Sequence, residues 1–144
     1  MTRPLSAKTF VYCSEGSPEG FDPAPYTAGR YELTKWLNFI STELHKGVFA
    51  PLMTTAAPEG ARAWARHLAH ERFALLSAHL AARPFLLDSF SVADAYLLSV
   101  LNWTEFAGLS LTDWPVLKAW RDAIRHRPSV AAAMATEMPL RQAA

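Results

Sequence analysis

Polar side chains that could contact a ligand lie at helical spacing between residues 38 and 45. Asn38, Thr42 and His45 occupy positions i, i+4 and i+7, which places them along one side of a helix. The imidazole of His45 changes charge near neutral pH, so it is the member of this stripe that could exchange a proton. A polar stripe on an amphipathic helix is ordinarily its solvated face, and ligand binding is the alternative that the pattern leaves open.

Two further groups of chemically capable side chains are weaker candidates. Cys13 is the single cysteine, and no helix N-terminus or base is predicted beside it to lower the pKa of its thiol, so we expect an inert thiol. His67, His70 and Glu71 follow the order His-x-x-His-Glu, which differs from the His-Glu-x-x-His order of zinc proteases. Because His67 and Glu71 can simply pair at i, i+4, we predict no metal site.

Composition excludes several classes of protein. Hydrophobic residues make up 51% and charged residues 19% of the chain, as in a packed globular domain. The formal net charge of +1 gives no reason to expect binding to nucleic acid or to an acidic membrane. No apolar run approaches the ~18 residues that span a bilayer, and residues 1–7 lack the apolar core of a secretory signal. We therefore expect a cytoplasmic protein, and one cysteine allows no internal disulfide.

The chain divides between Gly29 and Arg30 into two segments of different composition. Residues 1–29 contain four of the ten prolines, several of them in turn or extended dipeptides such as Asp22-Pro23. Residues 9–13 have strand-like composition but no second strand with which to pair. We predict an irregular, loosely ordered segment over residues 1–29 and a separate folded domain over residues 30–144.

From residue 30 onward, apolar residues recur at three- and four-residue intervals, which predicts helices. The apolar positions of the first helix are Leu33, Leu37, Ile40, Leu44 and Val48. We expect Gly47 and Pro51 to end this helix. The second helix opens at Pro58 and stops before Pro84, because proline is tolerated only in a first helical turn. Its apolar positions are Trp64, Leu68, Phe73, Leu76 and Leu80.

Ser91 and Asp94 predict the start of a third helix. They form a capping box, in which the Ser91 hydroxyl accepts from the Asp94 amide and the Asp94 carboxylate accepts from the Ser91 amide. The residues that follow are apolar nearly all round, which is typical of a central buried helix. They include Tyr96, Leu97, Val100, Leu101 and Trp103.

Two more helices complete the predicted domain. The fourth opens at residues 112–115 and turns Leu117, Trp120 and Ile124 inward. A basic cluster near its end is interpreted as charge that favours the negative end of the helix dipole. This cluster consists of Arg121, Arg125, His126 and Arg127. A short fifth helix runs from residue 129 to about residue 137, so the predicted fold is an all-α helical bundle.

Three motifs are spaced along residues 30–144 as in a known family. They are Thr42-Glu43-Leu44-His45-Lys46-Gly47, Phe90-Ser91-Val92-Ala93-Asp94-Ala95-Tyr96, and Trp114-Pro115 followed by Arg127-Pro128-Ser129-Val130. Together they resemble the C-terminal domain of glutathione S-transferases, and the first motif points to the bacterial beta class. The family usually has a glycine between the leucine and the aspartate of the turn before the third helix. This chain lacks it at Leu87-Asp88.

The resemblance implies that glutathione is a co-substrate conjugated to hydrophobic electrophiles, with no other cofactor. It places His45 beside the glutathione sulfur, as a polar contact or general base. The implied glutathione-binding residues are Asn38, Thr42, Glu43, Leu44, His45 and Lys46. The implied electrophile pocket consists of Phe49, Leu52, Met53, Trp103 and Phe106. In this family a thioredoxin-like domain supplies most of the glutathione site and the groups that lower the thiol pKa.

No part of residues 30–144 resembles that thioredoxin-like domain, so we expect little or no activity from this chain alone. Its expected partners are a thioredoxin-like domain or a second copy of the chain. Replacement of the missing catalytic cysteine by Cys13 is a minor alternative. Two other functions remain open: a non-catalytic interaction or dimerisation module, and a rearranged fusion fragment without a selected role.

Residues 8–29 resemble a different family, the periplasmic dipeptide-binding proteins of ABC transporters. The matching string is Lys8-Thr9-Phe10-Val11-Tyr12-Cys13-Ser14-Glu15-Gly16-Ser17-Pro18-Glu19-Gly20-Phe21-Asp22-Pro23, which is similar to the mature N-terminus of that family. A dipeptide-binding fold needs several hundred further residues, so the resemblance implies no peptide binding. We interpret the chain as a fusion of two gene fragments, natural or constructed.

Overall fold

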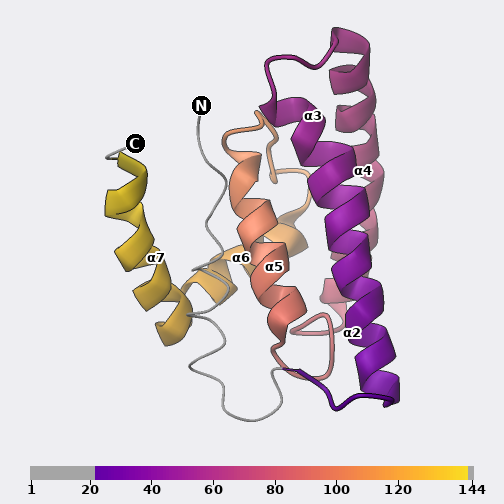
Figure 1. Cartoon of the computed structure of the whole chain (residues 1–144), viewed down its shortest axis with the longest axis vertical. Coiled ribbons are helices and arrows are strands. Elements are labelled where there is room, and N and C mark those ends of the chain that lie inside the picture. Colours follow the sequence, from indigo (N-terminus) through magenta and orange to yellow (C-terminus); the bar gives the residue numbers. More distant parts are fainter. Residues whose placement is uncertain (1–21, 143–144) are drawn as a thin grey trace.

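The computed structural model describes residues 22–142, and the regular elements within this range are all helical (Figure 1). The prediction of an all-α helical bundle is therefore confirmed for this part of the chain. The predictions for residues 1–21, including Cys13 and the strand-like run at residues 9–13, lie outside the described residues.

The first helical stretch is longer than predicted and changes its geometry along its length. The α-helix α2 (Ala28–Phe39) continues into the π-helical segment η1 (Ile40–Phe49) and then into α3 (Ala50–Met53). The Thr27 hydroxyl caps α2, which begins two residues before the predicted start at Arg30. The predicted end at Gly47 and Pro51 is wrong. Pro51 lies within the first two positions of α3, and the helical stretch continues past it to Met53.

The segment before α2 has no regular structure in residues 22–27, but it contacts the helix. The Arg30 guanidinium pairs with the Asp22 carboxylate and donates to the Pro23 carbonyl oxygen at 3.4 Å. The Thr27 hydroxyl donates to the Ala24 carbonyl oxygen at 2.7 Å. These contacts anchor residues 22–27 to the first turn of α2.

The long helix α4 (Glu59–Ala81) begins after Pro58 and ends before Pro84, as predicted. Its core-facing stripe, however, differs from the predicted one at its N-terminal end. Trp64 is 63% exposed, whereas the adjacent Ala65 is fully buried. Ala65 and Ala69 face inward, where small side chains let α4 lie close to its neighbours, and Trp64 is turned toward solvent. The prediction of Trp64 as a core residue is therefore wrong.

The helix α5 (Val92–Leu101) is buried on nearly all sides, as its apolar sequence predicts. The predicted capping box is present: the Ser91 amide donates to the Asp94 carboxylate at 2.8 Å, and the Asp94 amide reaches the Ser91 side chain. The same carboxylate also accepts from the Leu86 amide at 2.9 Å. Asp94 thus holds the turn before α5 as well as the helix start. A short 3₁₀ turn, η2 (Asn102–Thr104), follows α5.

The last two helices are α6 (Pro115–Arg125) and α7 (Pro128–Gln142), and α7 extends beyond the predicted end near residue 137. The basic cluster at the end of α6 does more than favour the helix dipole. Arg121, only 8% exposed, donates to the Thr104 hydroxyl at 3.3 Å, and Arg125 donates to the Asn102 side chain at 2.9 Å. These arginines join α6 to η2, a role that the local sequence pattern did not reveal.

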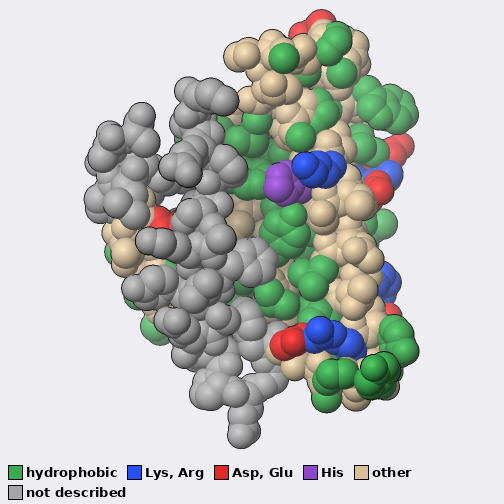
Figure 2. All heavy atoms as spheres, in the orientation of Figure 1, with side chains coloured by type: hydrophobic (Ala, Val, Ile, Leu, Met, Phe, Trp, Pro, Cys, Tyr) green, Lys and Arg blue, Asp and Glu red, His purple; other side chains and the backbone are tan. Residues whose placement is uncertain are grey.

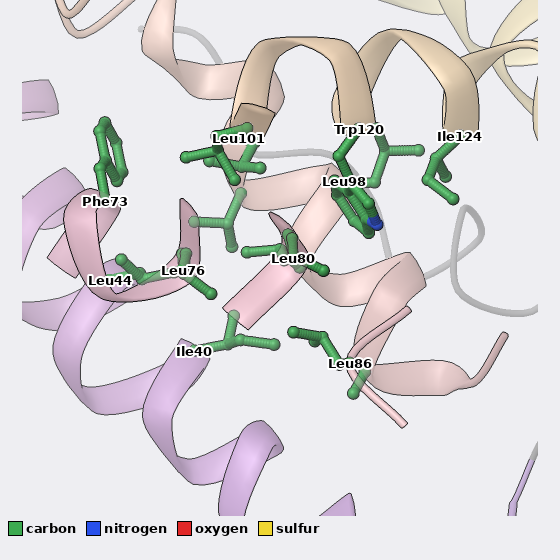
Figure 3. Packing of buried hydrophobic residues seen from close by; sticks show 14 of the residues in the cluster. Ile40, Leu44, Phe73, Leu76, Leu80, Leu86, Leu98, Leu101, Trp120 and Ile124 are labelled. Carbon is green, nitrogen blue, oxygen red and sulfur yellow. The ribbon is translucent and has the colours of Figure 1, made fainter. Parts of the chain in front are cut away.

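The core lies around α5. Figure 1 shows α5 between α2 and α4 on one side and α6 with α7 on the other. Side chains of η1, α4, α5, α6 and the loop before α5 meet there, as Figure 3 shows for Ile40, Leu44, Phe73, Leu76, Leu80, Leu86, Leu98, Leu101, Trp120 and Ile124. The indole N–H of Trp120 donates to the Pro84 carbonyl oxygen at 2.9 Å, which fixes that loop against α6. The buried side chains of η1 in this core pack that segment against α5.

Candidate functional site

His45 lies where the π-helical segment η1 packs against α5. Its Nδ1 atom is 2.9 Å from the Tyr96 hydroxyl, and its ring meets the Trp103 ring edge-on at a centroid distance of 4.8 Å. The side chain is half-buried. Figure 2 shows a histidine next to a basic side chain on the face formed by η1, with hydrophobic side chains around it.

The surroundings of His45 favour its neutral form. Burial is the larger cause that lowers the pKa of the imidazole, and the neighbouring positive charge of Lys46 lowers it further. Because the ordinary pKa of histidine is about 6.5, the ring is uncharged at neutral pH. A neutral imidazole can donate from one nitrogen and accept at the other.

The other polar residues predicted for this site are divided between two environments. Asn38, Thr42 and Lys46 are exposed on the same helical stretch, and the Thr42 hydroxyl donates to the Asn38 carbonyl oxygen at 2.8 Å. Glu43 instead pairs with Arg72 of α4, with nitrogen–oxygen distances of 2.8 and 2.9 Å. The side chain of Leu44 is fully buried in the core. Only the backbone of Leu44 is therefore available to a ligand.

The apolar residues predicted for an electrophile pocket also differ in accessibility. Phe49 is fully buried between Phe73 and Trp103, with ring-centroid distances of 6.4 and 5.8 Å. Leu52 and Met53 are partly buried at the end of the helical stretch. Phe106 is an exposed hydrophobic residue beyond η2. Trp103 is also buried, at 6% exposed, and Phe49 packs against its ring, so only Leu52, Met53 and Phe106 present apolar surface.

Two residues that contact this site were not found by sequence reasoning. Tyr96 was assigned only to the apolar surface of a buried helix, although its hydroxyl contacts His45. Arg72 lies on α4 and pairs with Glu43. A tyrosine in a buried helix does carry a usable signal, because a buried phenolic hydroxyl requires a hydrogen-bond partner. The sequence does not say which residue that partner is.

His67 and His70, both on α4, contact other side chains of the domain. His67 lies 3.5 Å from the Glu71 carboxylate, the i, i+4 pair that the sequence predicted, and the His70 ring packs edge-on against Trp114. Within residues 22–142, no cluster of three or more His, Cys, Asp and Glu side chains could hold a metal ion. Of the helices in that range, none combines the length and the apolarity that a membrane span requires.

A cavity of about 430 Å³ lies between residues 104–112 and α6. Lys118 and Arg121 line it, but both have carboxylate partners. Lys118 is 2.8 Å from Asp122, and Arg121 is 3.6 Å from Glu105. Since these cations are already neutralised, the cavity is a weaker candidate for binding an anion than the surface around His45.

Comparison with known proteins assigns the class of this domain. The family model for the glutathione S-transferase C-terminal domain matches residues 51–123. The chain belongs to the glutathione S-transferase family through this domain. It is 31% identical to the glutathione S-transferase GstA of Escherichia coli O157:H7 over 128 residues, which are 88% of this chain and 63% of GstA. The chain thus spans less than two thirds of that relative.

Solved structures agree on the fold. The chain is 34% identical to BphK, a bacterial glutathione S-transferase solved as a ternary complex, with a TM-score of 0.80 over 92% of this chain and 68% of BphK. It is 32% identical to a sphingomonad glutathione S-transferase solved with glutathione, with a TM-score of 0.78 over 95% of this chain and 72% of that one. A beta-class transferase of Sphingomonas chungbukensis is 30% identical, with a TM-score of 0.79 over 92% of this chain and 67% of that one.

A short stretch matches an unrelated protein. It is 68% identical to the dipeptide-binding protein of Escherichia coli K12 over 25 residues, which are 17% of this chain and 5% of that protein. This finding confirms the second resemblance drawn from the sequence. The match is far too short to carry the fold of a dipeptide-binding protein.

Proposed function

We propose that the surface around His45 is the C-terminal half of a glutathione site in a glutathione S-transferase. The observation that carries the proposal is the half-buried His45 in contact with Tyr96 and Trp103, on the same helical stretch as the exposed Asn38, Thr42 and Lys46. The similarity to a sphingomonad transferase solved with glutathione supports it. In the proposed complex His45 contacts the glutathione sulfur. The backbone of η1 and the charged side chain of Lys46 contact the rest of the tripeptide.

The proposed reaction is the attack of the glutathione thiolate on a hydrophobic electrophile. A free thiol has a pKa near 8.5, so little thiolate exists at neutral pH without a hydrogen-bond donor or positive charge beside the sulfur. One neutral imidazole supplies part of that stabilisation. We propose that residues 1–144 alone turn over little substrate, and that a thioredoxin-like domain or a second copy of the chain completes the site.

The electrophile would occupy the apolar surface next to His45. Trp103 contacts both the His45 ring and the Phe49 ring, so it connects the polar and apolar parts of the proposed site. Leu52 and Met53, which are partly buried, and the exposed Phe106 are proposed to add to this apolar surface. This arrangement favours hydrophobic electrophiles over charged ones, because a charged group would lose hydration there without gaining a partner.

We also propose that the chain joins two segments of different origin near residue 29. The match to a dipeptide-binding protein and the change in composition near residue 29 support this boundary. In this proposal, the contacts of Asp22 and Pro23 with Arg30 would join the first segment to the domain that follows.

A calorimetric titration with glutathione tests the site. We expect the chain to bind glutathione and the His45→Ala variant to bind it at least about fivefold more weakly, since one hydrogen bond contributes about 1 kcal/mol. The matched control is His67→Ala, which removes an exposed histidine of α4 that pairs only with its own helix and should leave binding unchanged. Equal binding by the His45→Ala variant would overturn the assignment. A chain that binds no glutathione would favour the interaction-module alternative.

A second assay tests turnover. With glutathione and a chromogenic aryl halide, we expect a rate close to the uncatalysed background. A clear rate that His45→Ala abolishes would contradict the proposal that this chain needs a partner.

A further inference from the structure

The contact between Tyr96 and His45 bears on which nitrogen of the imidazole carries the hydrogen, as well as on the position of the ring. Tyr96 belongs to α5, the most buried helix, while His45 belongs to η1, and their polar atoms are 2.9 Å apart. The two rings also meet nearly at right angles, with centroids 6.2 Å apart. The Trp103 ring contacts the imidazole as well. Both aromatic contacts restrict the rotation of the His45 ring, so the hydrogen bond acts on a ring whose orientation is already limited.

The two ring nitrogens of a neutral histidine are not equivalent, because one carries the hydrogen and the other carries the lone pair. The nitrogen that contacts Tyr96 is Nδ1. A phenol is a good hydrogen-bond donor and a poor acceptor, whereas the unprotonated nitrogen of imidazole is a good acceptor. The favourable arrangement is therefore O–H of Tyr96 donating to Nδ1 of His45.

We propose that Tyr96 is a positioning residue that donates its hydroxyl hydrogen to Nδ1 of His45 and so fixes this imidazole as the Nε2–H tautomer. The hydrogen bond made by one ring nitrogen of a functional histidine commonly selects the tautomer in this way. Tyr96 itself contacts no ligand in this proposal. It acts through His45.

The tautomer decides whether His45 can donate a hydrogen bond to a ligand or accept a proton from it. This consequence rests on the proposed glutathione site. With Nδ1 accepting from Tyr96, the remaining nitrogen carries a hydrogen and can only donate. His45 then stabilises an anion, such as a thiolate sulfur, by a hydrogen bond. It does not take the proton from a neutral thiol, since its basic lone pair is already engaged. The role of general base is thereby disfavoured.

Nitrogen-15 NMR of the full chain tests the tautomer directly, in the absence of glutathione. Long-range proton–nitrogen correlation spectra at pH 8 distinguish a protonated from an unprotonated ring nitrogen. The chain has five histidines, so the His45→Gln variant identifies the His45 signals by their loss. We expect an unprotonated Nδ1 and a protonated Nε2. The opposite pattern, or equal shares of both tautomers, would overturn the proposal.

The Tyr96→Phe variant tests the cause. It removes the donor but keeps the aromatic ring, and we expect the ratio of the Nε2–H to the Nδ1–H tautomer to fall about 2- to 10-fold, the worth of one hydrogen bond. The matched control is Tyr31→Phe, because Tyr31 is 68% exposed on α2. It should leave the His45 spectrum unchanged. An unaltered ratio in Tyr96→Phe would overturn the role of Tyr96.

The two proposals fail separately. If Tyr96→Phe does not fold, the spectrum of the unmodified chain still decides the tautomer. If that spectrum shows the Nε2–H form but the calorimetric titration detects no glutathione, the proposed function fails and the tautomer assignment stands. If glutathione binds but the spectrum shows the Nδ1–H form, only the inference about Tyr96 is overturned.

Discussion

The surroundings of His45 favour an uncharged imidazole that is ready to donate a hydrogen bond. Burial against α5 removes part of the hydration that a charged ring needs and so lowers its pKa, and Lys46 adds a positive charge on the next residue. Tyr96 occupies the Nδ1 lone pair. All three features favour the uncharged form of the imidazole, and together they distinguish this histidine from a solvated one on a helix face.

The first prediction concerns the pKa of His45. We expect an NMR titration to place it below the ordinary value of about 6.5, and Lys46→Gln to raise it, because Lys46 is one cause of the lowering. Lys35→Gln is the control: Lys35 lies about 15 Å away along the helix, beyond the screening length at physiological salt. A pKa that does not respond to Lys46→Gln would contradict the assigned cause.

The same shift makes stability depend on pH. Since the folded pKa is lower than the unfolded one, the unfolded chain binds a proton first as the pH falls below about 6.5. The contribution of His45 to the free energy of unfolding is therefore complete above pH 6.5. It decreases as the pH falls toward the folded pKa and then levels off. Urea unfolding of the chain and of His45→Gln over this range isolates the effect, which the variant should lack.

The π-helical segment η1 has a glycine, Gly47, at a position where a side chain would be crowded. A Cβ atom on Gly47 would lie 3.0 Å from Leu68 Cδ2 and 3.2 Å from the Thr42 carbonyl oxygen. The segment thus packs tightly against α4 at this point. The carbonyl of His45 accepts from the Ala50 amide, an i to i+5 hydrogen bond typical of π-helical geometry.

The second prediction compares two glycines. We expect Gly47→Ala to lower the free energy of unfolding by about 1–2 kcal/mol, because overpacking outweighs the higher helix propensity of alanine. At Gly60, near the start of α4, an added Cβ atom would meet nothing within 4 Å. There alanine should raise the free energy of unfolding by about 0.5–1 kcal/mol. Urea denaturation measures both changes. A stabilising effect of Gly47→Ala would show that Leu68 and the backbone of η1 can accommodate the added methyl group.

The start of α5 depends on Asp94. Burial raises the pKa of this carboxyl, and hydrogen bonds from Leu86 and Ser91 offset part of the rise. The bond from the Leu86 amide to the Asp94 carboxylate, 2.9 Å long, connects the turn before this helix to the capping box.

The third prediction removes this carboxylate. Asp94→Ala should lower the free energy of unfolding by about 2–4 kcal/mol, because it removes a cap and leaves buried amides without partners. Asp88→Ala is the control, since Asp88 is exposed and lies 3.9 Å from Arg83; its effect should stay within about 0.5 kcal/mol. Equal effects in thermal or urea unfolding would show that the cap is dispensable.

The molecule as a whole is stabilised by packing around α5. Leucines from η1, α4, α5 and α6 are fully buried there. Arginines of α6 also connect that helix to η2 by hydrogen bonds. This core also supports the candidate site, because Trp103 and Tyr96 project from the end and the side of the same helical stretch. Loss of core packing should therefore disturb the site as well as the fold.

The fourth prediction compares neighbouring leucines of α4. Leu76 is fully buried, whereas Leu75 is 48% exposed. We expect Leu76→Ala to lower the free energy of unfolding by about 2–5 kcal/mol and Leu75→Ala to change it by less than about 0.5 kcal/mol. Chemical denaturation followed by tryptophan fluorescence measures both. Similar losses in the two variants would mean that the face of α4 carrying Leu75 is covered in solution.

Local sequence was enough to predict the helices, the capping box at Ser91 and Asp94, and the buried character of α5. Hydrophobic periodicity, capping residues and prolines act over a few residues, so they can be recognised without the fold. The family motifs also lie in local strings. The same reasoning located His45 on a polar stripe, but it could not separate a ligand contact from a solvated face.

Tertiary packing decided the remaining features. Trp64 faces solvent because the buried face of α4 runs through Ala65 and Ala69, and Trp64 lies outside that face. The basic residues of α6 join η2 because the fold places Thr104 and Asn102 beside them. Above all, His45 and Tyr96 are 51 residues apart in sequence, and no local rule pairs them. Their contact exists because η1 packs against α5, and it is this contact that fixes the surroundings of the His45 imidazole.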